Sequence, residues 1–378
     1  MTNTHWRPPL PLRAHTSPHT GHHNLAHHVP PVSTRRPRPK PRKSLRSDDK
    51  NLPLFLCQDQ TDIKRKFYEL ENLQGERLTE SLDPPPPPQK SRWRLDDSDT
   101  ARSRNRYGNI APWEANRIRL KVPPHHNDYI NASPIKLRRS DGSVKRYIAT
   151  QGPKRGQLHH LWRMVWHETG PVAVIVMLTK TSELGMDKCY QYFPGQVGEE
   201  PLKIVDQEFG DGFAATIQLL DLQKDRKSAS EVRKLEMKVG GKSKTVWHLY
   251  FKGWPDYNVP DGTDKLALLE LVRLANEKNT GAENPLIVHC SAGVGRSGTF
   301  ITLDHFLFES SCSGFKNLKE HDDPIFEVVN KLREQRMHMV QSQVQFHFLY
   351  QVLREVMQER AKSVSPRSSG ELAKEGHD

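Results

Sequence analysis

Few folds accommodate residues 285–299, because an apolar strand there leads directly into a glycine-rich turn and then into a helix. The segment reads Pro-Leu-Ile-Val-His-Cys-Ser-Ala-Gly-Val-Gly-Arg-Ser-Gly-Thr. Its glycines match the dinucleotide-binding pattern G-x-G-x-x-G. That fold also needs a second parallel strand ending in an acid about 20 residues on, whereas residues 301–308 continue a helical pattern. The sequence therefore argues against a dinucleotide site.

The same segment places Cys290 before the turn and Arg296 after it, with five residues between them. Successive backbone N–H groups in such a turn, together with the start of a helix, form a site for a tetrahedral anion such as phosphate. An arginine can bind two oxygens of that anion at once. This positive environment favours the thiolate form of Cys290 and makes it a candidate nucleophile. A buried structural cysteine is the alternative, and the glycines, the arginine and the helix start together argue against it.

A thiolate can take phosphate from a phenol only if the leaving oxygen is protonated, and Trp254-Pro-Asp256 offers an acid. The pattern of strand to residue 251, helix from residue 263 and strand 286–289 predicts a crossover between parallel strands. Asp256 and Cys290 should then lie at the same carboxyl edge of the sheet, where ligands bind in such folds. An ordinary surface turn is the alternative for this tripeptide.

The first 50 residues differ in composition from the rest of the 378-residue chain. They carry ten Lys and Arg against two Asp, so they contribute +8 of the net charge of +12, and they are rich in Pro and His. We expect a disordered basic tail, with a nuclear-import signal at residues 35–46 as an alternative to a solvated linker. Basicity confined to a tail argues against nucleic-acid binding.

The cysteines and apolar runs limit the class of protein further. The four cysteines are widely spaced and form no Cys-x-x-Cys pair, so we expect neither a disulfide framework nor a structural zinc site. The longest apolar run, residues 172–178, is far shorter than the roughly 20 residues that span a bilayer, and no signal-peptide core precedes it. We therefore expect an intracellular protein without a membrane span.

Periodicity predicts one domain at residues 51–360 of an α/β, α+β-like class. A Pro-rich insert near residues 84–100 includes Pro84–Pro88, a stiff spacer or a ligand for a proline-binding module, and residues 361–378 read as a disordered C-terminal tail. Gly240-Gly241 predicts a hairpin. Helices are predicted at residues 59–77, 263–279, 298–310, 324–337 and 344–360. Strands are predicted at residues 147–150, 172–178, 188–193, 215–222, 232–239, 245–251 and 286–289.

Residues 55–360 resemble the tyrosine-specific, non-receptor protein phosphatases, with a fungal-type member as one possibility. The signature Val288-His-Cys-Ser-Ala-Gly-Val-Gly-Arg-Ser-Gly298 is highly specific for that family. The resemblance implies a single domain with a large twisted mixed β-sheet flanked by helices, and hydrolysis of phosphotyrosine through a phosphocysteine intermediate. The supporting motifs are Asn105-Arg-Tyr107, Asn127-Asp-Tyr-Ile-Asn-Ala-Ser133, Thr150-Gln-Gly-Pro153, Lys188-Cys-Tyr-Gln-Tyr-Phe-Pro194, Trp254-Pro-Asp256 and Gln341-Ser-Gln-Val-Gln345.

The resemblance also implies a role for each catalytic residue. Cys290 forms the phosphocysteine, and Asp256, on a mobile loop hinged near Trp254, protonates the phenol and then acts as base for water. Gln341, with Gln345 beside it, positions that water. Among the supporting residues, Ser297 would donate to the departing sulfur and His289 would help to keep the cysteine ionised. Glu183 would brace Arg296, and Lys188 would approach Asp256. For Glu183 and Lys188, the alternative is an ordinary surface charge.

Substrate binding is implied for the loop and for the cleft wall. Tyr107 would stack on the substrate ring and make the cleft too deep for phosphoserine. Asn109 stands where many members have Asp, which replaces a charge-assisted hydrogen bond by a weaker neutral one. His338 stands where broad-cleft members have Gly and would narrow a second phosphotyrosine pocket. The phosphate-binding loop residues are Ser291, Ala292, Gly293, Val294 and Gly295.

Partners and location follow from the same resemblance. We expect phosphotyrosine proteins as substrates, with activated protein kinases suggested by association with fungal members. We also expect a monomer without a metal or other cofactor, in the cytoplasm or also in the nucleus. A catalytically dead phosphotyrosine-binding module is the main alternative, and the presence of Cys290, Arg296 and Asp256 argues against it. The segment around Tyr107 argues against a dual-specificity phosphatase.

Overall fold

The computed structural model describes residues 52–83, 86, 91–255, 258–311, 314–315 and 318–364. Several sequence predictions lie outside these residues. They concern the basic tail, most of the proline run, Asp256 and the last 14 residues of the C-terminal tail.

An eight-stranded mixed sheet forms the centre of the described domain, in the order β1-β2-β10-β3-β9-β8-β7-β6. The four central strands β2, β10, β3 and β9 run parallel, and the outer pairs are antiparallel. A short hairpin joins β4 (Ser182–Glu183) to β5 (Met186–Asp187). The strands of the large sheet are β1 (Ala132–Arg138), β2 (Val144–Thr150), β3 (Val172–Met177), β6 (Leu202–Val205), β7 (Ala214–Asp225), β8 (Ser230–Val239), β9 (Lys242–Phe251) and β10 (Leu286–His289).

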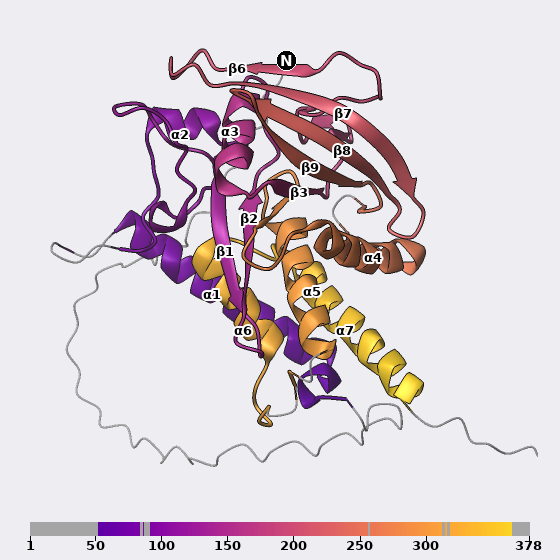
Figure 1. Ribbon diagram of the computed structural model, residues 1–378. Helices are drawn as coiled ribbons and strands as arrows, with labels where there is room; N and C mark the ends of the chain where they lie inside the picture. The colour runs from indigo at the N-terminus through magenta and orange to yellow at the C-terminus, as the bar shows by residue number, and fades with distance from the viewer. Residues whose placement is uncertain are drawn as a thin grey trace, which may run out of the picture. The chain divides into compact units, whose positions relative to one another are not determined.

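Helices cover both faces of the sheet (Figure 1). Residues of α1, α4, α5, α6 and α7 share one apolar core with the sheet, whereas α3 contributes to the core on the opposite face. The helices are α1 (Gln60–Leu82), α2 (Asp99–Arg104), α3 (Leu158–Glu168), α4 (Gly262–Lys278), α5 (Gly295–Ser311), α6 (Pro324–Gln335) and α7 (Gln343–Val364), with 3-10 turns η2 (Leu54–Cys57) and η3 (Glu114–Asn116).

Strand β3 shows why the sheet is covered on both sides. Val174 and Val176 belong to the first core, and the alternate residues Ala173, Ile175 and Met177 belong to the second. Side chains of a strand point alternately to the two faces, so a continuous apolar run is the expected pattern for a central parallel strand buried on both faces. This burial fixes the register of the strands that lead to the site.

Most predicted elements are confirmed, with shifted ends. Gly240 and Gly241 form the predicted hairpin turn, with φ of 52° and 79°. Helix α7 continues to Val364, past the predicted domain end at residue 360. The predicted strand at residues 188–193 is wrong: Lys188 and Tyr190 donate their amides to loop carbonyls. This segment therefore forms no ladder, although Cys189, Tyr192 and Phe193 are buried. Helix α3 and strands β1 and β6 were missed.

Candidate active site

The four parallel strands end at one edge of the sheet, and each leads into a segment that builds the site. Cys290 directly follows β10, and the loop 290–294 then joins helix α5. Strand β3 leads to Glu183, and β9 leads to Trp254. Strands β9 and β10 are parallel as predicted, but β3 lies between them. The carboxyl ends of these strands meet where the sequence predicts.

The loop after β10 wraps around the sulfur of Cys290. The amide of Gly293 donates to Sγ over 3.3 Å. Gly293 has φ of 72°, and a Cβ there would lie 2.1 Å from the carbonyl oxygen of Thr150. Only glycine meets both demands, the left-handed backbone and the close approach to β2. Glycine at this position is therefore what allows the loop to curl back toward the thiol.

Cys290 and Arg296 line one open cleft of about 500 Å³. Cys290 is 5 % exposed, so only a small part of this side chain is open to the cleft that it lines. Helix α5 begins at Gly295, which directs the first free N–H groups of the helix toward the same place. The residues lining the cleft are Tyr107, Asn109, Ile110, Glu183, Lys188, Cys290, Ser291, Ala292, Gly295, Arg296, Gln341, Ser342 and Gln345.

Glu183 holds the guanidinium of Arg296 through two parallel hydrogen bonds. Nη1 lies 2.6 Å from Oε1, and Nη2 lies 2.9 Å from Oε2. Arg296 also donates to the carbonyl of Leu178 over 3.1 Å. Burial alone would raise the pKa of Glu183, but the hydrogen bonds and charge of Arg296 hold it below its usual value. The predicted contact between Glu183 and Arg296 is thus present, and it fixes the plane of the guanidinium.

Arg336, which the sequence analysis missed, supports the loop from behind. It is fully buried and donates to the carbonyls of Gly293 (2.8 Å) and Ala292 (3.0 Å) and to Asn131 Oδ1 (2.7 Å). Burial lowers the pKa of Arg336 to about 10, so the side chain stays charged at neutral pH. By binding the outward-facing carbonyls it leaves the amides of the loop directed into the cleft.

His289 contacts the backbone of Cys290 and a neighbouring tyrosine. Its Nδ1 lies 3.0 Å from the carbonyl oxygen of Cys290, and its Nε2 lies 2.7 Å from the hydroxyl of Tyr192, which also contacts His248. Burial lowers the pKa of His289 to about 4. The ring is therefore neutral at pH 7 and contacts the backbone, so it positions the cysteine and supplies no positive charge.

The cleft wall is tied to the loop at Tyr107. Its hydroxyl lies 2.7 Å from Ser291 Oγ, which also donates to the carbonyl of Lys188 over 2.9 Å. Asn109 is exposed at the rim. His338 does not line this cleft and has φ of 56°, and its amide donates to Gln74. The structure thus brings together Tyr107, Asn109, Ser291 and Lys188 as predicted.

One predicted contact, from Ser297 to the sulfur, is not formed, whereas Gln345 lies beside Gln341 as predicted. The hydroxyl of Ser297 is buried and has no hydrogen-bond partner within the described ranges, so it does not donate to the sulfur here. Gln345 accepts from the amides of Gln341 (3.0 Å) and Ser342 (3.3 Å), which fixes the Gln341 segment over the cleft. Burying the Ser297 hydroxyl without a partner costs free energy. This hydroxyl can still donate a hydrogen bond to an atom that gains negative charge during a reaction.

Close packing joins the start of helix α5 to the Gln341 segment. A Cβ on Gly298 would lie 2.4 Å from the amide nitrogen of Val340. That amide donates to the carbonyl of Val294 over 3.2 Å. The start of α5 and the residues before Gln341 are therefore in direct backbone contact.

Comparison with known proteins decides the family. The model for "Protein-tyrosine phosphatase" matches residues 101–355. The chain belongs to the protein-tyrosine phosphatase family. Tyrosine-protein phosphatase 1 of Saccharomyces cerevisiae is 36 % identical to it over 328 residues, covering 79 % of this chain and 95 % of the relative. Tyrosine-protein phosphatase 2 of Schizosaccharomyces pombe is 37 % identical over 296 residues, covering 76 % of this chain and 38 % of the relative.

Solved structures agree with this phosphatase assignment. The catalytic domain of human protein tyrosine phosphatase non-receptor type 18 matches with a TM-score of 0.62 and 27 % identity, covering 79 % of this chain and 96 % of that one. The single domain with a large mixed sheet flanked by helices is thus confirmed, and the protein is an enzyme that hydrolyses phosphotyrosine. The yeast relatives fit a fungal-type, non-receptor member.

Proposed function

We propose that this phosphatase acts through Cys290 as nucleophile and Asp256 as general acid. The thiolate attacks phosphorus at the bottom of the cleft, so that an S–P bond forms as the bond to the phenol oxygen breaks. Asp256 gives its proton to that oxygen. Arg296 and the loop amides bind the non-bridging phosphate oxygens and stabilise the charge that develops on them.

The second step releases phosphate. Water, positioned by Gln341 and Gln345, attacks phosphorus and passes a proton to Asp256, while the S–P bond breaks. The hydroxyl of Ser297, which has no partner among the described residues, donates to the departing sulfur. In this scheme, Trp254 and Lys188 hold the loop that carries Asp256. The indole of Trp254 donates to the carbonyl of Asn258 over 3.0 Å, and this hydrogen bond links the residues on either side of Asp256.

One observation carries the proposal. The sulfur of Cys290 accepts the Gly293 amide inside the same cleft into which Glu183 orients Arg296. This arrangement matches the needs of a thiolate that must face a phosphorus atom and a cation that must face its oxygens. Tyr107 at the wall supports selection of the longer phosphotyrosine side chain.

Substrates are inferred at the level of phosphotyrosine proteins. Structures of the type 18 relative in complex with HER2 phosphopeptides support peptides as ligands. Activated protein kinases, a monomeric state, and action in the cytoplasm or nucleus stay predictions from the sequence. No described helix is long and apolar enough to cross a membrane.

Rapid-quench trapping of a labelled intermediate tests the covalent step. The parent enzyme should give a labelled phosphoenzyme within one turnover when it is quenched in alkaline detergent, since an S–P bond is labile in acid. Cys290→Ser should give none because a hydroxyl is not ionised as the thiol is. Cys57→Ser, a partly exposed cysteine in η2, is the matched control and should trap label normally. Label retained on Cys290→Ser would rule out the proposed nucleophile.

A further inference from the structure

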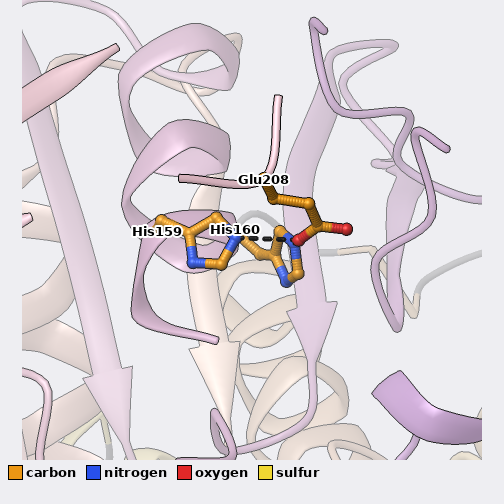
Figure 2. A group of neighbouring side chains, drawn as sticks. All are labelled: His159, His160 and Glu208. Atoms are coloured by element: carbon orange, nitrogen blue, oxygen red, sulfur yellow. Dashed lines mark hydrogen bonds and ion pairs between the residues drawn. The ribbon is translucent and has the colours of Figure 1, made fainter. Parts of the chain in front are cut away.

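A second cluster of chemically reactive side chains lies outside the cleft, between α3 and the connection from β6 to β7. It consists of His159, His160 and Glu208 (Figure 2). Nε2 of His160 lies 2.8 Å from Glu208 Oε2, and Nε2 of His159 lies 3.0 Å from the same oxygen. One ligand atom from each residue falls within 4.8 Å of the others. Two rings and a carboxylate thus converge on one point.

This convergence is unusual for neighbours on a helix. Consecutive helical residues project about 100° apart, yet the two rings pack with their centroids 3.9 Å apart and both turn toward Glu208. His160 is buried, and His159 is partly buried. The carboxylate comes from the β6–β7 connection, and its side chain is 41 % exposed. Ligand atoms from two separate elements therefore meet at this place.

The spacing suits a small divalent cation. Zinc binds imidazole nitrogen and carboxylate oxygen at about 2.0–2.2 Å in tetrahedral geometry, which places ligand atoms roughly 3.3 Å apart. The observed nitrogen-to-oxygen separations of 2.8 and 3.0 Å need to widen by a few tenths of an ångström. The Glu208 carboxylate, which both rings now face, must also shift to make room for the ion between the three ligand atoms. Two histidines, one carboxylate and a water form a common zinc ligand set.

The charge states of the ligands also suit a cation. Burial, with the nearby charge of Arg104, lowers the pKa of His160 to about 3, so this ring is neutral at pH 7. Partial burial opposes ionisation of Glu208, but hydrogen bonds from His159 and His160 and the charge of Arg104 lower its pKa to about 2. A neutral imidazole and an ionised carboxylate are the forms that ligate metal.

Arg104 shapes the site from its other side. It pairs with Oε1 of Glu208 and also donates to the carbonyls of Tyr129 and Asn127. Such a contact orients a ligating carboxylate through Oε1, so that Oε2 stays directed toward the two rings. The positive charge of Arg104 also repels a cation. We therefore expect reversible binding with a dissociation constant of about 1–100 μM, which is much weaker than binding at a structural zinc site.

We propose that His159, His160 and Glu208 bind one Zn²⁺ ion through the two Nε2 atoms and Oε2, with water as the fourth ligand. The rings give up their Nε2 protons, which move to Nδ1 or to solvent. The bound ion links α3 to the β6–β7 connection. This inference does not depend on the mechanism proposed for the cleft.

Calorimetric titration of zinc chloride into the full chain tests the site. All proteins carry Cys290→Ser, because the active-site thiol is itself a zinc ligand. Histidines elsewhere, including the pairs at residues 22–23 and 27–28, will add sites, so only differences between variants are interpreted. We expect His159→Ala and Glu208→Gln each to lose one binding equivalent. His167→Ala, a histidine on the same helix outside the cluster, should keep it.

Two further readouts keep the test decisive. Zinc should raise the melting temperature of the parent by more than that of His159→Ala, because only a site in the folded state stabilises it. An anomalous map from crystals of the Cys290→Ser protein soaked with one equivalent of zinc should show a peak between the three side chains. Unchanged stoichiometry in both variants, or no peak at the cluster, would overturn the proposal.

Discussion

Individual side chains in this phosphatase act mainly by fixing other groups. Glu183 fixes the guanidinium of Arg296, and Arg336 fixes the carbonyls of the phosphate loop. Gly293 acts through the absence of a side chain. The reacting atoms themselves are few, so most of the residues around them determine geometry. Substitutions at these positions should therefore change rates through misplacement of the loop or the guanidinium.

Glu183→Gln should lower kcat/KM roughly 10- to 100-fold, since a charged hydrogen bond contributes about 1.5–3 kcal/mol. Steady-state assays on an aryl phosphate measure this, with Glu270→Gln on the exposed face of α4 as the control.

The folded-state pKa of Glu183 lies below its usual value. The pair therefore stabilises the fold above about pH 4.3 and loses that effect as pH falls through the folded-state pKa. Equal stability of parent and variant at pH 7 would contradict this.

Gly293→Ala should abolish most activity, because the added Cβ would meet the Thr150 carbonyl at 2.1 Å. Gly142→Ala is a matched control: its φ is 86°, and nothing lies within 4 Å of an added Cβ. Backbone strain alone should cost about 1–2 kcal/mol there. Urea unfolding and turnover should show a larger stability loss, and a loss of activity, only for Gly293→Ala. Similar effects of both substitutions would show that strain, and not contact, limits the loop.

At the scale of elements, capping and burial explain what the sequence could predict. Asp323 and Pro324 begin α6 as expected, and alternating or helical apolar patterns gave most strands and helices. Residues 188–193 carried a strand-like pattern, yet their amides bond to loop carbonyls, and such long-range partners leave no local trace. For the same reason Arg336 was missed: its acceptors come from segments distant in the chain. The motifs identified the cleft residues because they form contiguous runs.

Asp323→Ala should destabilise the protein more than the loss of an ordinary helix cap. Its side chain accepts from the amide of Phe326, and its Oδ2 accepts from Gln58, Lys66 and Tyr350. We expect a loss of about 2–4 kcal/mol in the free energy of unfolding.

Asp59→Ala is the control for that experiment, since Asp59 caps α1 at an exposed site and should cost about 1 kcal/mol. Denaturant titration at neutral pH compares the two. Asp323→Asn, which keeps the cap, should fall between them. A cost for Asp323→Ala no greater than that for Asp59→Ala would mean that the contacts to α1 and α7 add nothing.

At the scale of the whole molecule, the site draws on residues from Tyr107 to Gln345. The central parallel strands bring these distant segments to one edge, so the site cannot exist without the complete sheet. Partial unfolding of the helical layer on either face should therefore reduce activity as well as stability. The sequence predicts that the basic N-terminal tail and the C-terminal tail contribute no residues to the site.

A fragment containing residues 52–364 should keep the melting temperature and kcat of the full chain, because the basic first 50 residues have too few apolar side chains to add to a core. Differential scanning calorimetry and steady-state kinetics compare the two proteins. KM for acidic phosphopeptides should rise in the fragment at low salt only, since the +8 charge acts over a screened distance. A lower melting temperature for the fragment would show that the tail packs on the domain.

The glycine contact between α5 and Val340 has a consequence for how the two half-reactions are timed. With backbone touching backbone at that point, the start of α5 and the segment before Gln341 are held together. In the proposed mechanism, the change from phosphoryl transfer to hydrolysis then depends on side-chain rotation, including that of Gln341, more than on movement of these two segments past each other. The added Cβ of Gly298→Ala would push α5 and Val340 apart. The loop of Cys290 and the segment of Gln341 could then move independently, and we expect the two steps of the reaction to be less well coordinated.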